Sequence, residues 1–585
     1  MITSHAPSAK EATKAPTDAT RHLCAGVYVD ERFRDLVINE VCTAPHRRVA
    51  PSYGFDIVPV MRHAWRAAAL SALARATVVG AAVVPAFVGA LPTTILVTCG
   101  LALLWVLQFA MSLRSSDDAP RARRRSERHG LGAARGQRSL LKLIVTWKYS
   151  GRLKYAEKAR AYRLIGAAAF ALFLTSLVTA ALHPDRAAEA LYLAGAITVT
   201  CLIVGAARQL MLNRLMRAPA LRPKRLSRRQ RVVDAQQHDV HAVYRRPQHS
   251  EDDDDLTRFT LFGEESPFIG AGELVYQWNP PMCLQLLRPG DEKTPLHERE
   301  YLEPPFEAYE LVDHLREAVE QLDTDTGDVR LPTRAGHRIY IAETDVAADR
   351  NLLPSRIEEV DIRRIINTPG CKQHHFLEIT TAIEGAEFVA IVLLHVSLRG
   401  RTLSISTAAC VLTNTPRSFQ RTAEFGQNGA VAVTWEAFRQ LSTLPEEIQR
   451  SWRITRYLFA LSKAAFLPRD LTSAPIRSVL IGTRVSAREK TSQAWSKIQL
   501  EKTELLGRMK IIEQRILGAA SDFLRDKDID VSEFDDRALK IINSGIIAFG
   551  DNNNFNNNAV GDGSQVGGSG NQPVGPNAQG SGGTQ

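Results

Sequence analysis

The 585-residue chain has room for a membrane unit and at least one soluble domain, and its net charge of +10 is unevenly distributed. Residues 1–250 hold 37 Lys and Arg against 15 Asp and Glu, whereas the remainder holds 36 against 48. Seven scattered cysteines without a C-x-x-C pair argue against a disulfide framework and a zinc site, and they fit a reducing cytoplasm.

The first 66 residues are predicted to precede any apolar span. Residues 1–20 are rich in Ala, Thr, Ser and Pro and lack the apolar core of a signal peptide, so we expect a disordered tail. Residues 21–66 are expected to form a small cytoplasmic element, because Phe33, Leu36 and Val37 fall at helical spacing before Pro45.

Two uncharged regions predict membrane crossings. Residues 76–113 carry no charged side chain, and at ~1.5 Å per residue they are too long for one crossing of a ~30 Å hydrocarbon layer. A second uncharged pair lies within residues 164–207. We therefore predict two helical hairpins (67–113 and 164–207, four spans), turning at Gly89–Pro92 and at 183–189. Two buried hairpins of a soluble protein are the alternative, but these segments lack a polar stripe.

The charges around the spans predict their orientation. The loop 114–163 carries 15 Lys and Arg against 4 acidic residues, and residues 208–255, read as a linker, begin equally basic. By the positive-inside rule, both termini and the central loop face the cytoplasm. Anionic headgroups explain these basic loops more simply than nucleic acid does, because aromatic residues are sparse among them.

Residues 256–480 predict a cytoplasmic α+β domain. Strand-like runs at 274–278, 283–287, 337–346, 374–383, 386–398 and 401–413, the last three joined by short turns, surround a helix-like segment at 305–322. Residues 388–398 are apolar on both faces, which predicts a central strand. A polar helix beginning at Pro445 is expected to pack on this domain.

A long helix is predicted at 486–526, with an apolar seam at heptad spacing. Its leading members are Trp495, Ile498, Leu505, Met509 and Ile512. The seam predicts either a coiled coil, and with it a homo-oligomer, or a long helix that packs on its own domain.

The Asn/Gly-rich tail, 541–585, combines Ile547, Phe549 and Phe555 with a run of asparagines. Stacked strands can turn such asparagines into hydrogen-bonded ladders. The segment resembles the short amyloid-type signalling motifs that end some bacterial effector and receptor chains, which implies a protein partner with a similar C-terminal motif. A disordered tail of biased composition is the alternative.

A second resemblance covers most of residues 21–422. The segments RHLCAGVYVD, APSYGFDIVPVMRHAW and PFIGAGELVYQW are similar to ones that recur in actinobacterial multi-span membrane proteins of unknown function. The resemblance implies membrane hairpins with a cytoplasmic domain, and it carries no activity.

No catalytic, cofactor or metal motif is complete. Gly270 and Gly272 lack the third glycine of a dinucleotide fingerprint, and 526–537 lacks the glycine and the final acid of a calcium loop. We therefore predict a non-enzymatic membrane protein whose cytoplasmic domain binds a partner or senses a signal, with a role in signalling or defence through its amyloid-like tail as the more specific hypothesis. A membrane pore or transporter component, and an enzyme with an unrecognised site in the α+β domain, are the alternatives.

Overall fold

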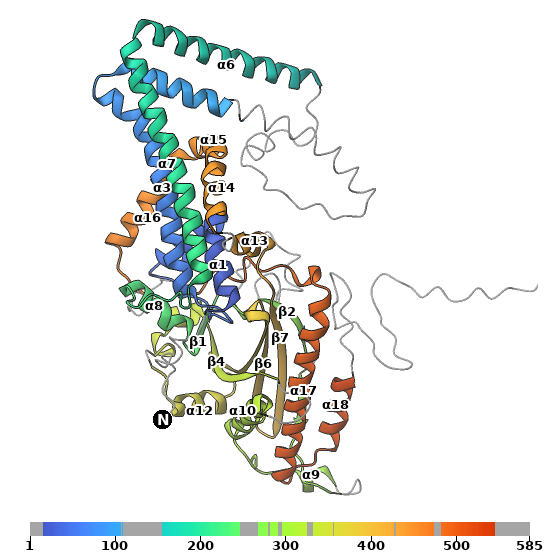
Figure 1. Cartoon of the computed structure of the whole chain (residues 1–585). Coiled ribbons are helices and arrows are strands. Elements are labelled where there is room, and N and C mark those ends of the chain that lie inside the picture. The colour runs from blue at the N-terminus through green and yellow to red at the C-terminus, as the bar shows by residue number, and fades with distance from the viewer. Residues whose placement is uncertain are drawn as a thin grey trace, which may run out of the picture.

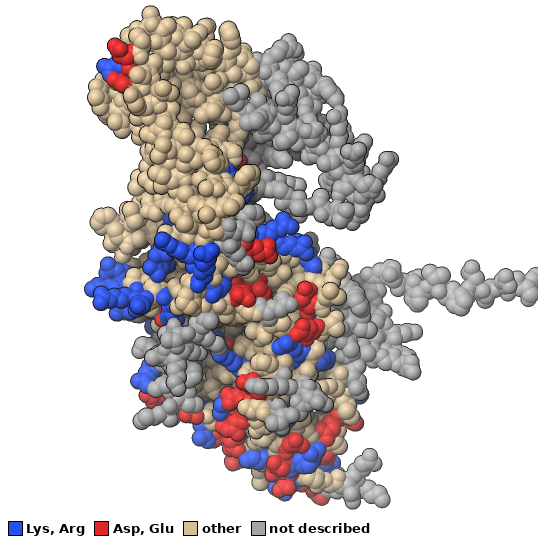
Figure 2. Space-filling model, in the orientation of Figure 1, with Lys and Arg blue, Asp and Glu red and all other residues tan. Residues whose placement is uncertain are grey.

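The computed structural model describes residues 16–106, 108, 155–245, 267–278, 281–290, 295–324, 331–354, 356–425, 429–472 and 481–543. Two long helices, α3 (Ile57–Phe87) and α7 (Pro184–Arg217), lie side by side and lead into a mixed-sheet domain (Figure 1). Figure 2 shows that their far end is almost free of charged residues, and that Lys and Arg gather where the helices approach the domain. The molecule therefore has an apolar helical part and a charged domain.

Three helices of the described chain are long and apolar enough to cross a membrane: α3, α7 and the Ile165–Leu182 part of α6 (Tyr155–Leu182). The turns fall near the predicted positions, after Phe87 and at His183. The second turn is shorter than the predicted 183–189, since α7 already begins at Pro184. Proline is tolerated there because it stands in the first helical turn. The second predicted span, in the first hairpin, corresponds only to a shorter apolar helix, Leu91–Val106. Four spans are therefore not confirmed. The basic loop 114–163 lies outside the described residues up to position 154.

The first apolar helix begins ten residues before the predicted hairpin, at Ile57, where Asp56 caps it by accepting a hydrogen bond from the backbone N–H of Val58. Its N-terminal part carries the charged residues Arg62 and Arg66. This part is held by packing against neighbouring protein segments, and its composition is not that of a lipid-exposed helix. Residues 57–66 of this helix fall in the predicted N-terminal element, because the prediction of a span rests on the uncharged stretch alone.

Small helices surround the domain-proximal ends of α3 and α7. The N-terminal segment forms α1 (Asp18–Val29), α2 (Glu31–Leu36) and a π-helical turn η2 (Val37–Cys42). Residues 16–20, predicted to be disordered, include the cap and first turn of α1, with Ala19 and Thr20 buried. The segment after the sheet forms the helices α13 (Arg417–Phe425), α14 (Gly429–Ser442), α15 (Leu444–Gln449) and α16 (Ile454–Phe466), with a 3-10 turn η6 (Ser451–Arg453).

The predicted packing of the helix at Pro445 on the α+β domain is not observed. Instead, α14 packs along α7, while α15 and α16 pack against α3. One face of this segment, Trp452, Phe459 and Phe466, is 56%, 61% and 88% exposed. An apolar outward face was mistaken for a core-facing one because the heptad spacing of these residues is the same in both cases.

The sheet of the described chain has seven strands: β1 (His241–Tyr244), β2 (Glu273–Gln277), β3 (Met282–Gln285), β4 (Arg334–Ala342), β5 (Gln373–Ile383), β6 (Phe388–Arg399) and β7 (Thr402–Leu412). The strand order is β1-β4-β5-β6-β7-β2, and β3 also pairs with β7. Only β1 and β4 pair in parallel among these. The strand β6 is central, as its two apolar faces predict.

Two apolar cores flank this sheet. Helices α10 (Ala308–Thr324), α12 (Glu359–Asn367) and α17 (Leu500–Asp526) cover one face, where Val392 and Leu394 are buried. On the other face, Ile391 and Leu393 pack with Tyr53 of the N-terminal segment and with Phe268. The sheet is thus covered on one side by its own helices and on the other by the segment that leads into α3.

Several predicted boundaries shift. The linker 208–255 contains α8 (Arg228–Gln237) and the edge strand β1, so the sheet begins before the predicted domain boundary. The predicted strand 337–346 ends at Ala342 and continues as α11 (Glu343–Ala348), followed by a 3-10 turn, η4 (Arg350–Leu352). The remaining short elements are α9 (Leu296–Arg299), η5 (Glu384–Ala386), η7 (Trp495–Lys497) and α18 (Ser532–Asn543).

Candidate functional site at the junction of helices and sheet

Arg488 lies fully buried where three distant chain segments meet. Its guanidinium donates hydrogen bonds to the carbonyl oxygens of Tyr53 (2.5 Å), Ala386 (2.6 Å) and Glu387 (2.9 Å). Burial lowers the pKa of Arg488 to about 10, so the side chain is still charged at neutral pH. A guanidinium can serve several carbonyls at once because its donors form a fixed planar fork. Arg488 therefore ties the segment before α3 to the turn between β5 and β6.

The backbone at this junction depends on Gly54. Its φ is +70°, and a Cβ atom added there would lie 2.8 Å from the Cβ of Ala386 and 2.9 Å from Arg488 Nη1. Only glycine combines this conformation with so close an approach. Ala386 itself has φ +67°, an uncommon value for a residue with a side chain. The hydrogen bond from Arg488 to its carbonyl oxygen holds this conformation in place.

A second polar contact joins the same segment to the sheet. The Tyr53 hydroxyl donates to Glu378 Oε2 on β5 (2.7 Å), and Arg338 on β4 donates to both carboxylate oxygens of Glu378 (2.6 and 3.2 Å). Arg338 also donates to the backbone oxygen of Asp239, whose carboxylate pairs with Arg48. Burial and the neighbouring Glu378 charge raise the pKa of Tyr53, so the phenol stays a neutral donor.

Helix α1 is attached by a buried carboxylate. Glu387 accepts hydrogen bonds from His22 Nδ1 (2.6 Å) and from the backbone N–H of Thr415 (2.8 Å). Burial raises the pKa of Glu387, but these hydrogen bonds outweigh it and leave the pKa below its ordinary value. The ionised carboxylate can therefore connect α1 to the start of β6 and the end of β7.

A separate ion cluster ties α2 and α15 to α3. Arg75, only 5% exposed, pairs with Glu31 (2.8 Å) and with Glu447 (2.9 Å), and Arg453 also pairs with Glu31 (2.8 Å). Removal of one partner would leave a charge buried without compensation, which costs several kcal/mol. These contacts fix α15 beside α3 at the start of its uncharged part.

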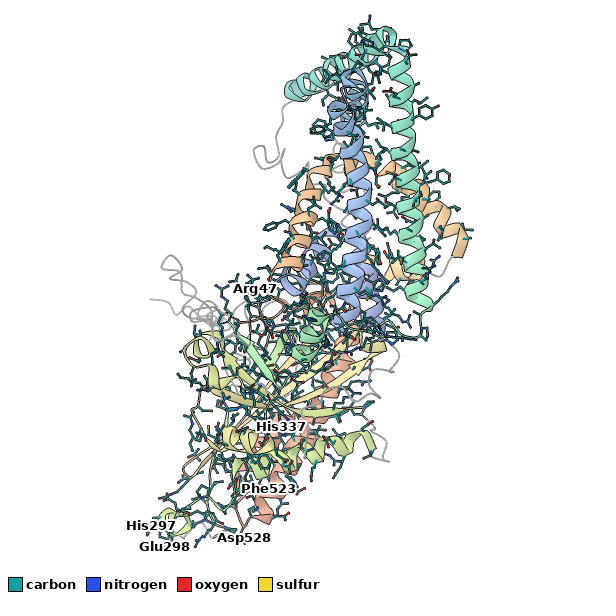
Figure 3. The ribbon with its side chains drawn as sticks, turned by 90° about the vertical axis from the view of Figure 1, so that its left-hand side faces the viewer. Arg47, His297, Glu298, His337, Phe523 and Asp528 are labelled. Atoms are coloured by element: carbon teal, nitrogen blue, oxygen red, sulfur yellow. The ribbon has the colours of Figure 1, made fainter. Side chains whose placement is uncertain are left out.

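Three histidines lie on neighbouring strands of the sheet. His337 Nδ1 is 3.0 Å from His375 Nε2, and His395 Nδ1 donates to the carbonyl oxygen of His375 (2.8 Å). Burial and the two neighbouring histidines lower the pKa of His375 well below its ordinary value. Among the described residues, no group of three or more His, Cys, Asp or Glu side chains could hold a metal ion. Figure 3 places His337 within the sheet domain, away from Arg47 near the base of the long helices.

The predicted seam residues lie together inside one chain. Trp495, Ile498, Leu505, Met509 and Ile512 are all buried in the core that α17 forms with α10 and the sheet. The helix begins at Leu500 rather than at Ser486, because the preceding residues form turns, and the backbone N–H of Trp495 donates to Glu273. This arrangement favours the prediction that the helix packs on its own domain over the prediction of a coiled coil between chains. Ile547, Phe549 and Phe555 lie outside the described residues.

The junction residues were missed by sequence reasoning. Arg488 stands in the polar run SAREK, where nothing distinguishes it from a solvated arginine. Arg338 and Glu378 were placed on predicted strands, and the pairing of those strands would have brought them together. Arg488 can be recognised only from its contacts in the folded structure, since its neighbours in the sequence do not distinguish it.

Comparison with known proteins classifies part of the chain. An AbeC-like domain spans residues 277–556, which is less than half of the 585 residues. The match covers most of the sheet, and it includes α14 to α16, which pack against α3 and α7. No curated protein and no solved structure matches the chain. The AbeC-like domain therefore contributes elements on both sides of the junction.

Proposed function

We propose that this chain is a multi-pass protein of the cytoplasmic membrane, with four spans and both termini in the cytoplasm. The apolar helices α3, α6 and α7 leave many large apolar side chains exposed, such as Val199 and Ile203. A continuous apolar surface of this extent is unfavourable in water and suits lipid. The excess of Lys and Arg on residues 114–163 supports the cytoplasmic placement of that loop.

The proposed role of the sheet domain is to bind a partner or sense a signal and to pass this event to the membrane helices. The observation that carries the proposal is the continuity of α3 and α7. Each runs unbroken from the apolar end to the domain, and the segment before α3 is bonded to the sheet through Arg488 and Glu378. A shift at this face of the sheet would therefore move the start of α3. Coupling of this kind requires a packed polar junction rather than a flexible linker.

The tail is proposed to carry the output. Ile547, Phe549 and Phe555 flank asparagine runs that would form ladders in stacked strands, and a partner with a similar C-terminal motif would be recruited by templating. A peptide covering residues 541–566 should form fibrils with a strand spacing of ~4.7 Å. The same peptide with Ile547→Pro should stay monomeric. A wild-type peptide that stays monomeric would remove the tail from the proposal and leave the membrane topology untouched.

Membrane insertion is tested by alkaline extraction of membranes from cells that express the full chain. The double variant Val199→Arg, Ile203→Arg places two charges on the exposed face of α7. Each charge costs ~2.5–3.5 kcal/mol of insertion free energy near a bilayer centre. The variant should therefore move from the pellet to the supernatant or be degraded. The control, Leu302→Arg with Val360→Arg, adds the same charges to exposed apolar positions of the sheet domain and should stay in the pellet. Equal behaviour of the two variants would contradict the proposal.

A further inference from the structure

A cavity of about 560 Å³ opens beside the domain-proximal part of α3. Its walls come from the end of η2, from α3, from the start of α8 and from the end of α16 with the residues that follow it. Met61 and Trp65 of α3 and Leu467 after α16 supply apolar surface. The cavity is therefore built by four segments that are far apart in sequence, and all of them belong to the helical part.

Every charged residue that lines this cavity is basic: Arg228, Arg229, Lys463 and Arg469. Neither Arg228 nor Arg469 pairs with a carboxylate of the described residues, and both are exposed. Arg229 is held by the wall itself, because it donates to the carbonyl oxygens of Val41 (2.9 Å), Ala44 (3.0 Å) and Arg469 (3.1 Å). Cations around an apolar floor, without a carboxylate among the lining residues, favour an anionic amphiphile.

The cavity adjoins the exposed apolar face of α16. Phe466 is almost fully exposed, and Leu467, which follows it, both lines the cavity and reaches solvent. Lys463 lies over the ring of Phe459 at 4.6 Å, so its ammonium group is held at the border between the aromatic face and the cavity. Trp65 contacts Tyr457 of α16 with its ring edge. An acyl chain along α16 would thus be continuous with a charged group in the cavity.

We propose that this cavity binds the phosphate headgroup of an anionic phospholipid of the cytoplasmic leaflet. Arg228, Lys463 and Arg469 would surround the phosphate, while Met61, Trp65 and Leu467 would contact the glycerol and the first carbons of the chains. Lipid is favoured over free phosphate, because a small anion would leave the apolar floor exposed to water. The inference rests on the proposed membrane location and adds a ligand class to it.

The test measures lipid binding to the purified full chain in a non-ionic detergent, with phosphatidylglycerol and phosphatidylcholine as probes and glycerol 3-phosphate as the free anion. The triple variant Arg228→Gln, Lys463→Gln, Arg469→Gln should bind phosphatidylglycerol at least roughly tenfold more weakly, since each cation contributes to headgroup attraction. The control Arg217→Gln, Lys224→Gln, Arg225→Gln removes three exposed charges of the same region that do not line the cavity, and it should change binding less than about twofold.

Phosphatidylcholine should bind weakly to all three proteins. An equal loss in both triple variants would show a general basic surface and would overturn the proposed site. Binding of glycerol 3-phosphate as tight as that of phosphatidylglycerol would overturn the assignment to lipid. Failure of the membrane location is a different outcome, because it is detected in the alkaline extraction and not in this binding assay.

Discussion

Replacement of Arg488 by Met tests the junction directly. The substitution keeps a long side chain but removes the donors that serve the carbonyl oxygens of Tyr53, Ala386 and Glu387. A buried carbonyl without a partner costs ~1–3 kcal/mol, and removal of a buried charge offsets part of the total, so we expect a loss of about 3–5 kcal/mol. This is a large fraction of the ~5–15 kcal/mol that stabilises a typical domain.

The assay combines thermal unfolding of the purified full chain in detergent with hydrogen exchange of residues 48–56 and 384–388. In the Arg488→Met variant, both segments should exchange faster and the unfolding temperature should fall. Arg488→Lys keeps the charge but loses the planar fork, so its loss should be intermediate. The exposed Arg484→Met serves as the control on the same segment and should behave like the parent. An Arg488→Met protein with parental stability and exchange would refute the role assigned to this residue.

Three further predictions concern other parts of the chain. Gly205→Leu should detach α14 from α7, because a Cβ there would lie 2.7 Å from the backbone oxygen of Glu436. Cysteine crosslinking between the two helices should therefore fall. The control Gly195→Leu has open space around the added side chain and should leave the crosslinking unchanged. The pKa of His375 is lowered in the folded state, so as the pH falls the unfolded state takes up the proton first. The free energy of unfolding should therefore decrease as the pH drops below ~6.5. His375→Gln should flatten this dependence in denaturation curves between pH 7 and 5. Leu505→Asp should unfold the sheet domain in circular dichroism, whereas Asp at the exposed Leu500 should not; a folded, merely monomeric Leu505 variant would restore the coiled-coil interpretation.

The regular elements of the sheet domain were accessible from sequence because their periodicity is strong. The alternation in β5 and the two apolar faces of β6 predict their places, and α10 follows a clear helical stripe. The short edge strand β1 escaped notice, because four residues in a basic and His-rich segment give too little pattern to recognise. Element type was therefore predictable where burial imposes a long pattern.

The packing partner of each apolar face could not be predicted. Heptad spacing in residues 495–512 is the same for a coiled coil and for a helix on its own sheet, and only the fold places Leu505 and Met509 against α10 and the sheet. The outer face of α16 is the opposite case, since Phe459 and Phe466 point outward instead of into a core. A periodic pattern identifies the apolar face of a helix. Whether that face packs on the same domain, on another chain or on lipid depends on the tertiary structure.

The most direct test of the account is the side of the membrane on which each part lies. Fusion of a reporter that is active only in the cytoplasm after residue 250, and at Pro184 between α6 and α7, measures this in intact cells. The account predicts full activity at residue 250 and none at Pro184, because α7 would cross the bilayer between the two sites. Activity at both positions, or the reverse pattern, would contradict it.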